Sequence, residues 1–242
     1  MLRLDKYLAD MGAGTRSEVK DLIRRGRVQV DGIVCRLPEQ KVDPAVNEVV
    51  LEGQRIGYQK FYYYMMNKPA GVVTAREDGR DRTVMEVLAE EGVNCPAFAE
   101  LSPVGRLDKD TEGLLLVTND GALAHRLLAP GKHVVKTYYA RVQGEMTPAD
   151  VRAFAEGIRL SDFTAMPAEL EILAVGEGVS EVLIRIQEGK FHQVKRMVHA
   201  VGKEVTRLKR LSMGSLELDE KLEPGEWREL TEQEIKELGG SL

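Results

Sequence analysis

Residues 105–118 read GRLDKDTEGLLLVT, a charged loop between two glycines that runs directly into a strongly apolar segment. Four consecutive apolar residues followed by the turn sequence Asn-Asp-Gly are typical of a buried β-strand. A rigid strand can hold the loop before it, so that one carboxylate and one guanidinium stay fixed at the edge of a sheet. A solvated loop before a core strand has the same pattern, and the spacing of Asp108, Asp110 and Glu112 does not tell which acid would act.

Strands outnumber helices in the chain after residue 60. Apolar runs and alternating patterns predict strands at 61–66, 114–118, 137–143, 168–175 and 179–187. Cap residues and helical spacing predict helices at 83–91, 122–128 and 148–156. Because these strands and helices do not alternate one for one, we expect an α+β domain with a mixed, mainly antiparallel sheet rather than a doubly wound parallel sheet.

The sequence pattern of residues 1–58 indicates a small domain, which a second domain at 59–242 follows. Apolar residues recur at helical spacing in the first turns, and the sequence TRSE then fits a capping box before a second helix. The alternating segment VQVDGIV at 28–34 contains an Asp-Gly pair, which is a strong signal for a β-hairpin. These elements predict a compact helix-helix-hairpin unit, in which Asp5 of the first helix would face solvent.

The formal charge of -5 is unevenly distributed along the chain. Residues 1–60 hold 11 Lys and Arg against 9 Asp and Glu, and residues 185–210 hold 8 against 2. Because local potential sets the attraction to phosphate, a chain that is acidic overall can still bind nucleic acid. A solvated helix could also have a basic face, but the density of cations on the second helix favours contacts with RNA phosphates. These contacts would come from Arg16, Lys20, Arg24, Arg25 and Arg27.

Composition excludes several classes of protein. A chain of 242 residues with 43% apolar residues can form a folded core, and its apolar runs are too short to cross a bilayer. The amino terminus is polar rather than a signal peptide, so we expect a cytoplasmic protein without a membrane partner. The two cysteines lack zinc-site spacing, and no glycine-rich nucleotide motif or nucleophile elbow is present. We therefore expect no metal and no cofactor.

A second polar cluster, QEGKFHQVKRMVH at 187–199, begins at the end of a strand and continues as a helix. Helical spacing buries its apolar residues and leaves Lys195 and Arg196 to meet phosphate or a carboxylate. The two histidines are seven residues apart, which does not fit a helical zinc pair. We expect RNA contacts from His192, Gln193 and Arg196.

Four motifs resemble, in order, those of the RNA pseudouridine synthases, most closely the RsuA branch that modifies small-subunit ribosomal RNA. They are NKPAG at 67–71, GRLDKDTEGLL at 105–115, KTY at 136–138 and EGKFHQVKRM at 188–197. Residues 1–58 similarly resemble the αL-type RNA-binding domain of ribosomal protein S-four. The resemblance covers nearly the whole chain and implies catalytic roles for Asp108, Tyr138 and Lys195.

The reaction implied by this resemblance converts a uridine of ribosomal RNA to pseudouridine. No group is gained or lost, so no cofactor is needed, but the base must be flipped out of its stack. An ionised Asp108 would act on the sugar or the base, Lys195 would keep it ionised, and Tyr138 would stack on the base. Arg106 would contact phosphate and help to hold the base out of the stack. The usual target of this branch is uridine 516 of 16S rRNA.

Two alternatives stay open at the level of sequence. The same reaction could act on a 23S rRNA uridine, because sister branches share the three central motifs. A non-catalytic RNA-binding ribosome-assembly factor would also use the amino-terminal domain and the basic segment at 185–210. We expect the partner to be 16S rRNA within a partly assembled small subunit, bound by a monomer.

Overall fold

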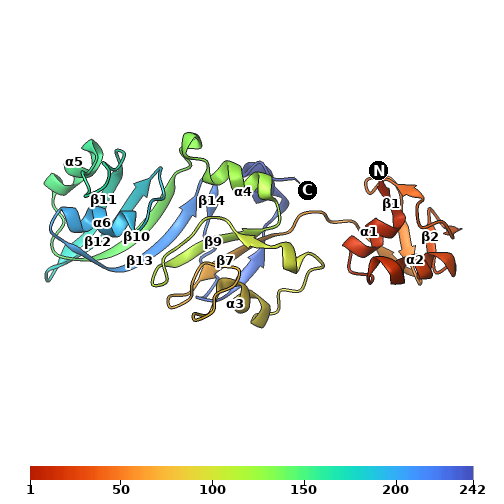
Figure 1. Cartoon of the computed structure of the whole chain (residues 1–242). Helices are drawn as coiled ribbons and strands as arrows, with labels where there is room; N and C mark the ends of the chain where they lie inside the picture. Colours follow the sequence, from red (N-terminus) through yellow and green to blue (C-terminus); the bar gives the residue numbers. More distant parts are fainter. Residues whose placement is uncertain (242) are drawn as a thin grey trace. The chain divides into compact units, whose positions relative to one another are not determined.

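The computed structural model describes residues 1–241 and divides them into two compact units (Figure 1). One unit comprises Met1–Tyr62 and Asn94–Leu101, and the other comprises Tyr63–Val93 and Ser102–Ser241. The predicted division into domains at residues 1–58 and 59–242 stays a prediction. No helix of residues 1–241 is long and apolar enough to span a membrane.

The amino-terminal unit contains the predicted pair of helices and the hairpin. Its helices are α1 (Leu4–Asp10) and α2 (Arg16–Arg24), and a complete capping box formed by Thr15 and Glu18 starts the second helix. A small sheet has the order β3-β2-β5-β6, and β1 pairs with β4. These strands are β1 (Leu2–Arg3), β2 (Val28–Val30), β3 (Ile33–Cys35), β4 (Lys41–Val42), β5 (Val49–Leu51) and β6 (Gln54–Ile56).

Asp5 is buried, so the prediction that it faces solvent is wrong. Its side chain is 0% exposed and accepts hydrogen bonds from Arg3 at 3.0 and 2.9 Å. Arg16 and Lys20 place their cationic nitrogens 3.7 and 3.9 Å from its carboxylate oxygens. The hydrogen bonds from Arg3 outweigh the effect of burial and lower the pKa of Asp5. Helical spacing alone could not reveal this site, because β1 and α2 supply the cations.

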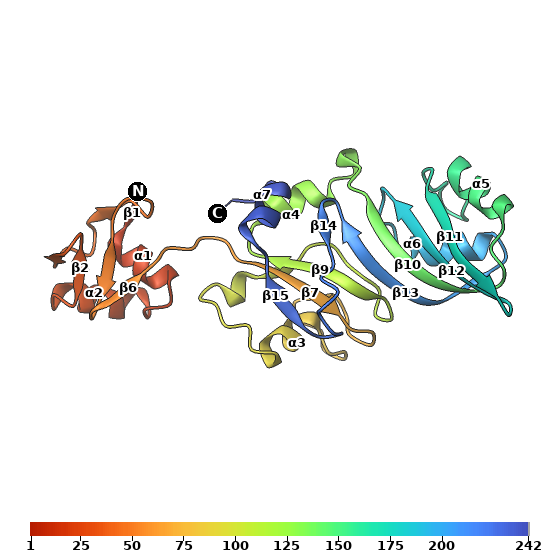
Figure 2. The same cartoon turned by 180° about the vertical axis from the view of Figure 1, so that it is seen from behind.

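The second unit is built on a nine-stranded mixed sheet, seen from behind in Figure 2. Its main order is β11-β12-β10-β13-β9-β7-β15, with β14 paired to β13 and β8 paired to β9. The pair β9–β13 is parallel, whereas the other pairs between these strands are antiparallel. The strands are β7 (Tyr63–Lys68), β8 (Ser102–Pro103), β9 (Glu112–Thr118), β10 (Lys136–Gln143), β11 (Glu169–Gly176), β12 (Val179–Ile186), β13 (Glu204–Met213), β14 (Leu216–Glu217) and β15 (Trp227–Glu229). The predicted α+β class is confirmed.

The parallel contact between β9 and β13 joins the two halves of this sheet. It is short, pairing Lys209 with Glu112 and Arg210 with Gly113. A Cβ atom on Gly113 would lie 2.2 Å from the carbonyl oxygen of Arg210, and the residue has a positive φ of 102°. Only glycine permits this backbone approach without displacing a strand.

Two helices, α5 and α6, pack against the sheet that carries Tyr138. α5 contacts β11 and α6 contacts β13, and Phe154, Met197 and Val198 belong to the buried core that also contains Val142 and Ile184. The helices of this unit are α3 (Val84–Glu90), α4 (Gly121–Leu128), α5 (Pro148–Glu156), α6 (Gln193–Ala200) and α7 (Glu232–Glu237).

An ion-pair network holds the acidic carboxyl-terminal segment to the sheet. Arg228 on β15 donates two hydrogen bonds to Glu234 of α7, at 2.9 and 2.8 Å, and one to Asp219 at 2.7 Å. Glu234 also accepts from the backbone and hydroxyl of Thr231. The hydrogen bonds from Arg228, supported by those from Thr231 and opposed by burial, lower the pKa of Glu234 to about 2.

Replacement Glu234→Gln should lower the free energy of unfolding by about 1–3 kcal/mol at pH 7, because it removes the charged acceptor of Arg228. The folded-state pKa of Glu234 lies below its ordinary value of 4.5, so its stabilisation is complete above that pH and declines as the pH falls towards 2. Urea denaturation at neutral and acidic pH measures the difference. The exposed Glu232→Gln is the matched control and should change stability by less than about 0.5 kcal/mol. Equal effects of the two variants would contradict the network.

Candidate active site

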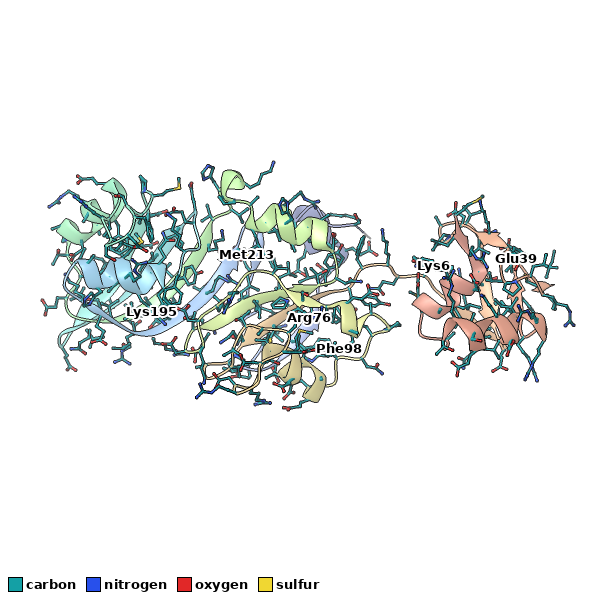
Figure 3. All side chains as sticks on the ribbon, viewed as in Figure 1. Lys6, Glu39, Arg76, Phe98, Lys195 and Met213 are labelled. Carbon is teal, nitrogen blue, oxygen red and sulfur yellow. The ribbon has the colours of Figure 1, made fainter. Side chains whose placement is uncertain are left out.

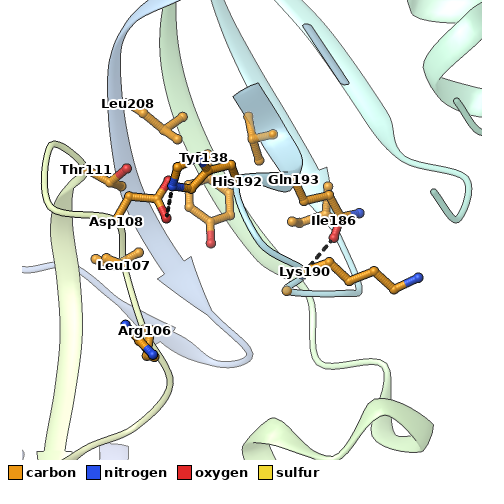
Figure 4. Close-up of a pocket in the computed structure, with 12 residues that line it drawn as sticks. Arg106, Leu107, Asp108, Thr111, Tyr138, Ile186, Lys190, His192, Gln193 and Leu208 are labelled. Atoms are coloured by element: carbon orange, nitrogen blue, oxygen red, sulfur yellow. Dashed lines mark hydrogen bonds and ion pairs between the residues drawn. The ribbon is translucent and has the colours of Figure 1, made fainter. Parts of the chain in front are cut away.

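Three segments that are distant in sequence converge on one pocket of the second unit (Figure 4). The loop between β8 and β9 brings Asp108, β10 brings Tyr138, and the start of α6 brings His192. Figure 4 shows the Asp108 carboxylate turned towards His192, with the Tyr138 ring beside them. The pocket is lined by Arg106, Leu107, Asp108, Thr111, Tyr138, Ile186, Gly189, Lys190, His192, Gln193, Val194 and Leu208.

Two basic side chains face the Asp108 carboxylate. Lys195, on α6 (Figure 3), places Nζ 3.1 Å from Oδ2, and His192 places Nε2 3.5 Å from Oδ1. Lys195 also bonds Asp110 at 2.5 Å. Burial lowers the pKa of Lys195, but its hydrogen bonds to Asp110 and Asp108 outweigh burial and raise that pKa above its ordinary value. Lys195 is therefore a permanent cation beside Asp108 at neutral pH.

Hydrogen bonds from neighbouring segments hold the Asp108 loop in place. The hydroxyl of Thr74 donates to the Leu107 carbonyl at 2.9 Å and accepts from the Leu107 amide at 3.2 Å. The Thr111 amide donates to the Asp108 carbonyl at 3.0 Å and closes the turn. Hydrogen bonds therefore hold the backbone that carries the Asp108 carboxylate, and the Lys195 cation faces the carboxylate itself.

Lys68, at the end of β7, binds the backbone of the same loop on its buried side. Its side chain is fully buried, and its amine donates to the carbonyls of Pro69, Lys109 and Thr111 at 2.9, 3.3 and 2.8 Å. Burial lowers the pKa of Lys68 to about 8, although the carboxylates of Asp110 and Asp108 act in the opposite direction. The motif NKPAG marked this segment in the sequence, but a lysine there gave no sign that its amine would point inward.

Strand alternation separates the two neighbouring tyrosines of β10. Tyr138 belongs to the buried core with Leu107, Ile184 and Leu208, and it is 8% exposed. Tyr139 lies on the opposite face of the strand, since successive side chains alternate. The structure thus brings Tyr138, the tyrosine favoured by sequence, into the pocket with Asp108.

The other residues predicted in this unit occupy different positions around the pocket. Arg106 is exposed at the rim, whereas Gln193 is buried and bonded to Glu188 at 2.9 Å and to the Lys190 amide at 3.1 Å. Arg196 pairs with Asp162 and does not line the pocket. RNA contact by these side chains stays a prediction. The predicted cations Arg16, Lys20, Arg24, Arg25 and Arg27 belong to the other unit.

An exposed aromatic ring beside the pocket was missed by the sequence analysis. Phe191 is 76% exposed, and its ring stacks on His192 with centroids 3.8 Å apart. His192 adopts a positive φ of 49° at the start of α6, which turns the chain into the helix. Single exposed aromatic residues are common in sequences, so only the stacking geometry distinguishes this one.

Comparison with known proteins identifies both units. A family model for RNA pseudouridylate synthase matches residues 62–200, and a model for the S4 domain matches residues 2–50. A protein named uncharacterized RNA pseudouridine synthase YtzG from Bacillus subtilis is 47% identical over 97% of both chains. The chain belongs to the RNA pseudouridine synthase family.

Other similarities agree with this membership. Ribosomal small subunit pseudouridine synthase A of Vibrio parahaemolyticus is 42% identical and aligns over 97% of this chain and 98% of its own. A crystal structure of a pseudouridylate synthase has 35% identity and a TM-score of 0.66, covering 98% of this chain and 100% of that one. This RNA pseudouridine synthase is therefore an isomerase of uridine in RNA with an S4 domain, as the resemblance predicted.

Replacement Lys68→Met should loosen the Asp108 loop of this RNA pseudouridine synthase, because three carbonyl oxygens lose the hydrogen bond from the Lys68 amine. We expect faster hydrogen exchange at the amides of Gly71 and Thr111, which donate to the carbonyls of Lys109 and Asp108. Global stability should fall by about 1–3 kcal/mol. Exchange in β11 and β12 is the internal reference. Unchanged protection of the loop relative to those strands would show that the amine does not hold it.

Proposed function

We propose that this enzyme isomerises uridine 516 of 16S rRNA, acting as a monomer on a partly assembled small subunit. Family membership supports the reaction, and relatives named ribosomal small subunit pseudouridine synthase A support the small-subunit target. The observation that carries the proposal is the convergence of Asp108 and Tyr138 on one pocket, with the Lys195 amine 3.1 Å from the Asp108 carboxylate. Such a target would place the enzyme in the cytoplasm, where ribosomal subunits are assembled.

The proposed chemistry begins with a uridine flipped out of the RNA stack into the pocket. Asp108, 3.1 Å from the Lys195 amine, acts on the sugar or the base. The bond between C1′ and N1 breaks, the uracil turns, and C1′ forms a bond to C5. The C5 proton then leaves and N1 gains a proton, so the atoms balance without a cofactor.

Residues around Asp108 would bind and orient the flipped nucleotide. Tyr138 presents a ring to the pocket for stacking on uracil. Arg106 at the rim would contact a phosphate and occupy the space that the base leaves. His192, 3.5 Å from Asp108 and stacked on Phe191, would contact the RNA at the pocket entrance. Gln193 would act through its bonds to Glu188 and Lys190, because its side chain is buried.

The S4 domain would supply affinity for structured RNA through its basic helix. Arg24, Arg25 and Arg27 are exposed at the end of α2, where they can meet phosphates. Arg16 and Lys20 lie on the same helix but share the buried carboxylate of Asp5. Arg24 and Arg27 pair with the exposed carboxylates of Asp21 and Glu52, so these cations at the carboxyl end of the helix are more accessible to a phosphate.

Replacement Asp108→Asn should reduce formation of pseudouridine by at least about 10³-fold while RNA binding is retained, because the amide cannot act as a carboxylate. The measurement is pseudouridine mapping of 16S and 23S RNA, each free and in ribosomal particles, after incubation with either protein. Asp110→Asn is the matched control, since this exposed neighbour also pairs with Lys195. Near-normal turnover by Asp108→Asn would show that the catalytic acid is assigned wrongly.

The same map tests the target. One new site at uridine 516 in the small-subunit particle, absent with Asp108→Asn, is the expected result. A new site in 23S RNA would replace the proposed target while keeping the reaction. Modification of free 16S RNA alone would contradict the assembly intermediate as substrate.

Removal of Arg24, Arg25 and Arg27 by triple replacement with Gln should weaken RNA binding and lower its salt dependence. Loss of three phosphate contacts should reduce the slope of log affinity against log salt by about 2 to 3. Fluorescence anisotropy with 16S RNA at several salt concentrations measures the slope. Arg55→Gln, an exposed arginine on β6, is the control. A slope equal to that of the wild type would place the phosphate contacts elsewhere.

A further inference from the structure

A second cavity adjoins the Asp108 pocket along β10. The two cavities share Arg106, Tyr138, Gly189 and Lys190 in their linings, so Tyr138 lies between them. The second cavity extends away from Asp108 towards the end of β13, where Met213 lies (Figure 3). Its lining adds side chains that the reaction described above does not use.

Two of these side chains are buried cations. Lys136 is 8% exposed and Arg210 is 3% exposed, and both line the second cavity. Lys136 shares a face of β10 with Tyr138, because it lies two residues away, and Arg210 is the partner of Tyr138 on β13. The two cations thus flank the ring on adjacent strands.

Neither cation has a carboxylate partner within residues 1–241. Arg210 donates through Nε to the Leu114 carbonyl at 2.8 Å, but its buried Nη2 atom has no hydrogen-bond partner. The amine of Lys136 makes no hydrogen bond or ion pair with the described part of the chain. The carboxylate of this lining, Glu188, already accepts from the Met166 amide and Gln193 and pairs with Lys190.

Burial of two neighbouring like charges without an anion is unfavourable. Burial, reinforced by the charge of Arg210, lowers the pKa of Lys136. Apolar residues of similar size would stabilise the fold better at position 136, because no partner would be lost. The remaining cations of the lining, Arg106 and Lys190, increase rather than compensate the positive potential.

We propose that Lys136 and Arg210 form a binding subsite for one RNA phosphate, beside the pocket that takes the flipped uridine. The inference rests on the proposed position of that uridine between Asp108 and Tyr138. A phosphodiester oxygen would accept from the Lys136 amine and lie beside the Arg210 guanidinium, giving both cations an anionic partner. The subsite would hold the strand next to the target nucleotide while Tyr138 separates phosphate from base.

The test compares full-length wild type with Lys136→Met and with the double variant Lys136→Met, Arg210→Gln. Fluorescence anisotropy with a labelled short oligouridylate measures affinity over a range of KCl concentrations. The double variant should bind about tenfold more weakly at low salt, and its slope against log salt should fall by about 0.7, the value for one single-strand phosphate. Lys209→Gln is the matched control, because it removes a cation from the opposite face of β13.

Thermal unfolding separates a binding role from a structural one. Lys136→Met should keep or raise the melting temperature while it weakens RNA binding, since it removes a buried charge that has no partner. Arg210→Gln also loses the hydrogen bond to the Leu114 carbonyl, so the double variant can fail to fold. In that case the RNA affinity of Lys136→Met alone tests the phosphate subsite. Unchanged affinity and slope in folded Lys136→Met would overturn the subsite.

Measured turnover on 16S RNA separates a failure of the phosphate subsite from a failure of the proposed target. Release of tritium from 16S RNA labelled at C5 of uridine should show a raised KM in Lys136→Met, with Lys209→Gln close to wild type. If the wild type leaves 16S RNA unmodified, the proposed target is wrong. The salt dependence of oligouridylate binding still tests whether the phosphate subsite exists. If the wild type is active and the slopes of wild type and variant coincide, the subsite alone is wrong.

Discussion

The contact between Gly113 and Arg210 is the constraint on which the second unit depends. At this point two strands approach so closely that a single added carbon would collide with a backbone oxygen. The contact connects β9, which follows the Asp108 loop, to β13, which pairs with the strand of Tyr138. The acid and the aromatic ring of the site are therefore positioned by the same backbone junction, although they come from different halves of the sheet.

Charge in the site is arranged in layers around the loop of residues 108–111. Lys195 pairs with the carboxylates on the pocket side, whereas Lys68 binds carbonyl oxygens on the buried side. The first cation keeps a raised pKa because it has anionic partners, and the second has a pKa of about 8 because burial dominates. One amine thus contacts the carboxylate of the loop, and the other contacts its backbone.

Sequence patterns predicted what depends on local periodicity and short motifs. The α+β class and the helix at α5 followed from such signals, whereas the grouping of Asp108 with Tyr138 and Lys195 was implied by the resemblance of three motifs to a known family. The strand β13 was not predicted, because its charges resembled a basic surface rather than a sheet interior. The buried positions of Asp5 and Lys68 also escaped detection, since long-range partners determine the burial of a charged side chain and leave no periodic trace.

Asp5 limits the freedom of two cations on the basic helix of the S4 unit. Its carboxylate attracts Arg16 and Lys20, so these long side chains lose part of their rotamer freedom in the folded protein. If RNA binds this helix as proposed, a phosphate would meet two cations that an internal counter-ion already orients. Such ordering before contact would lower the entropic cost of association.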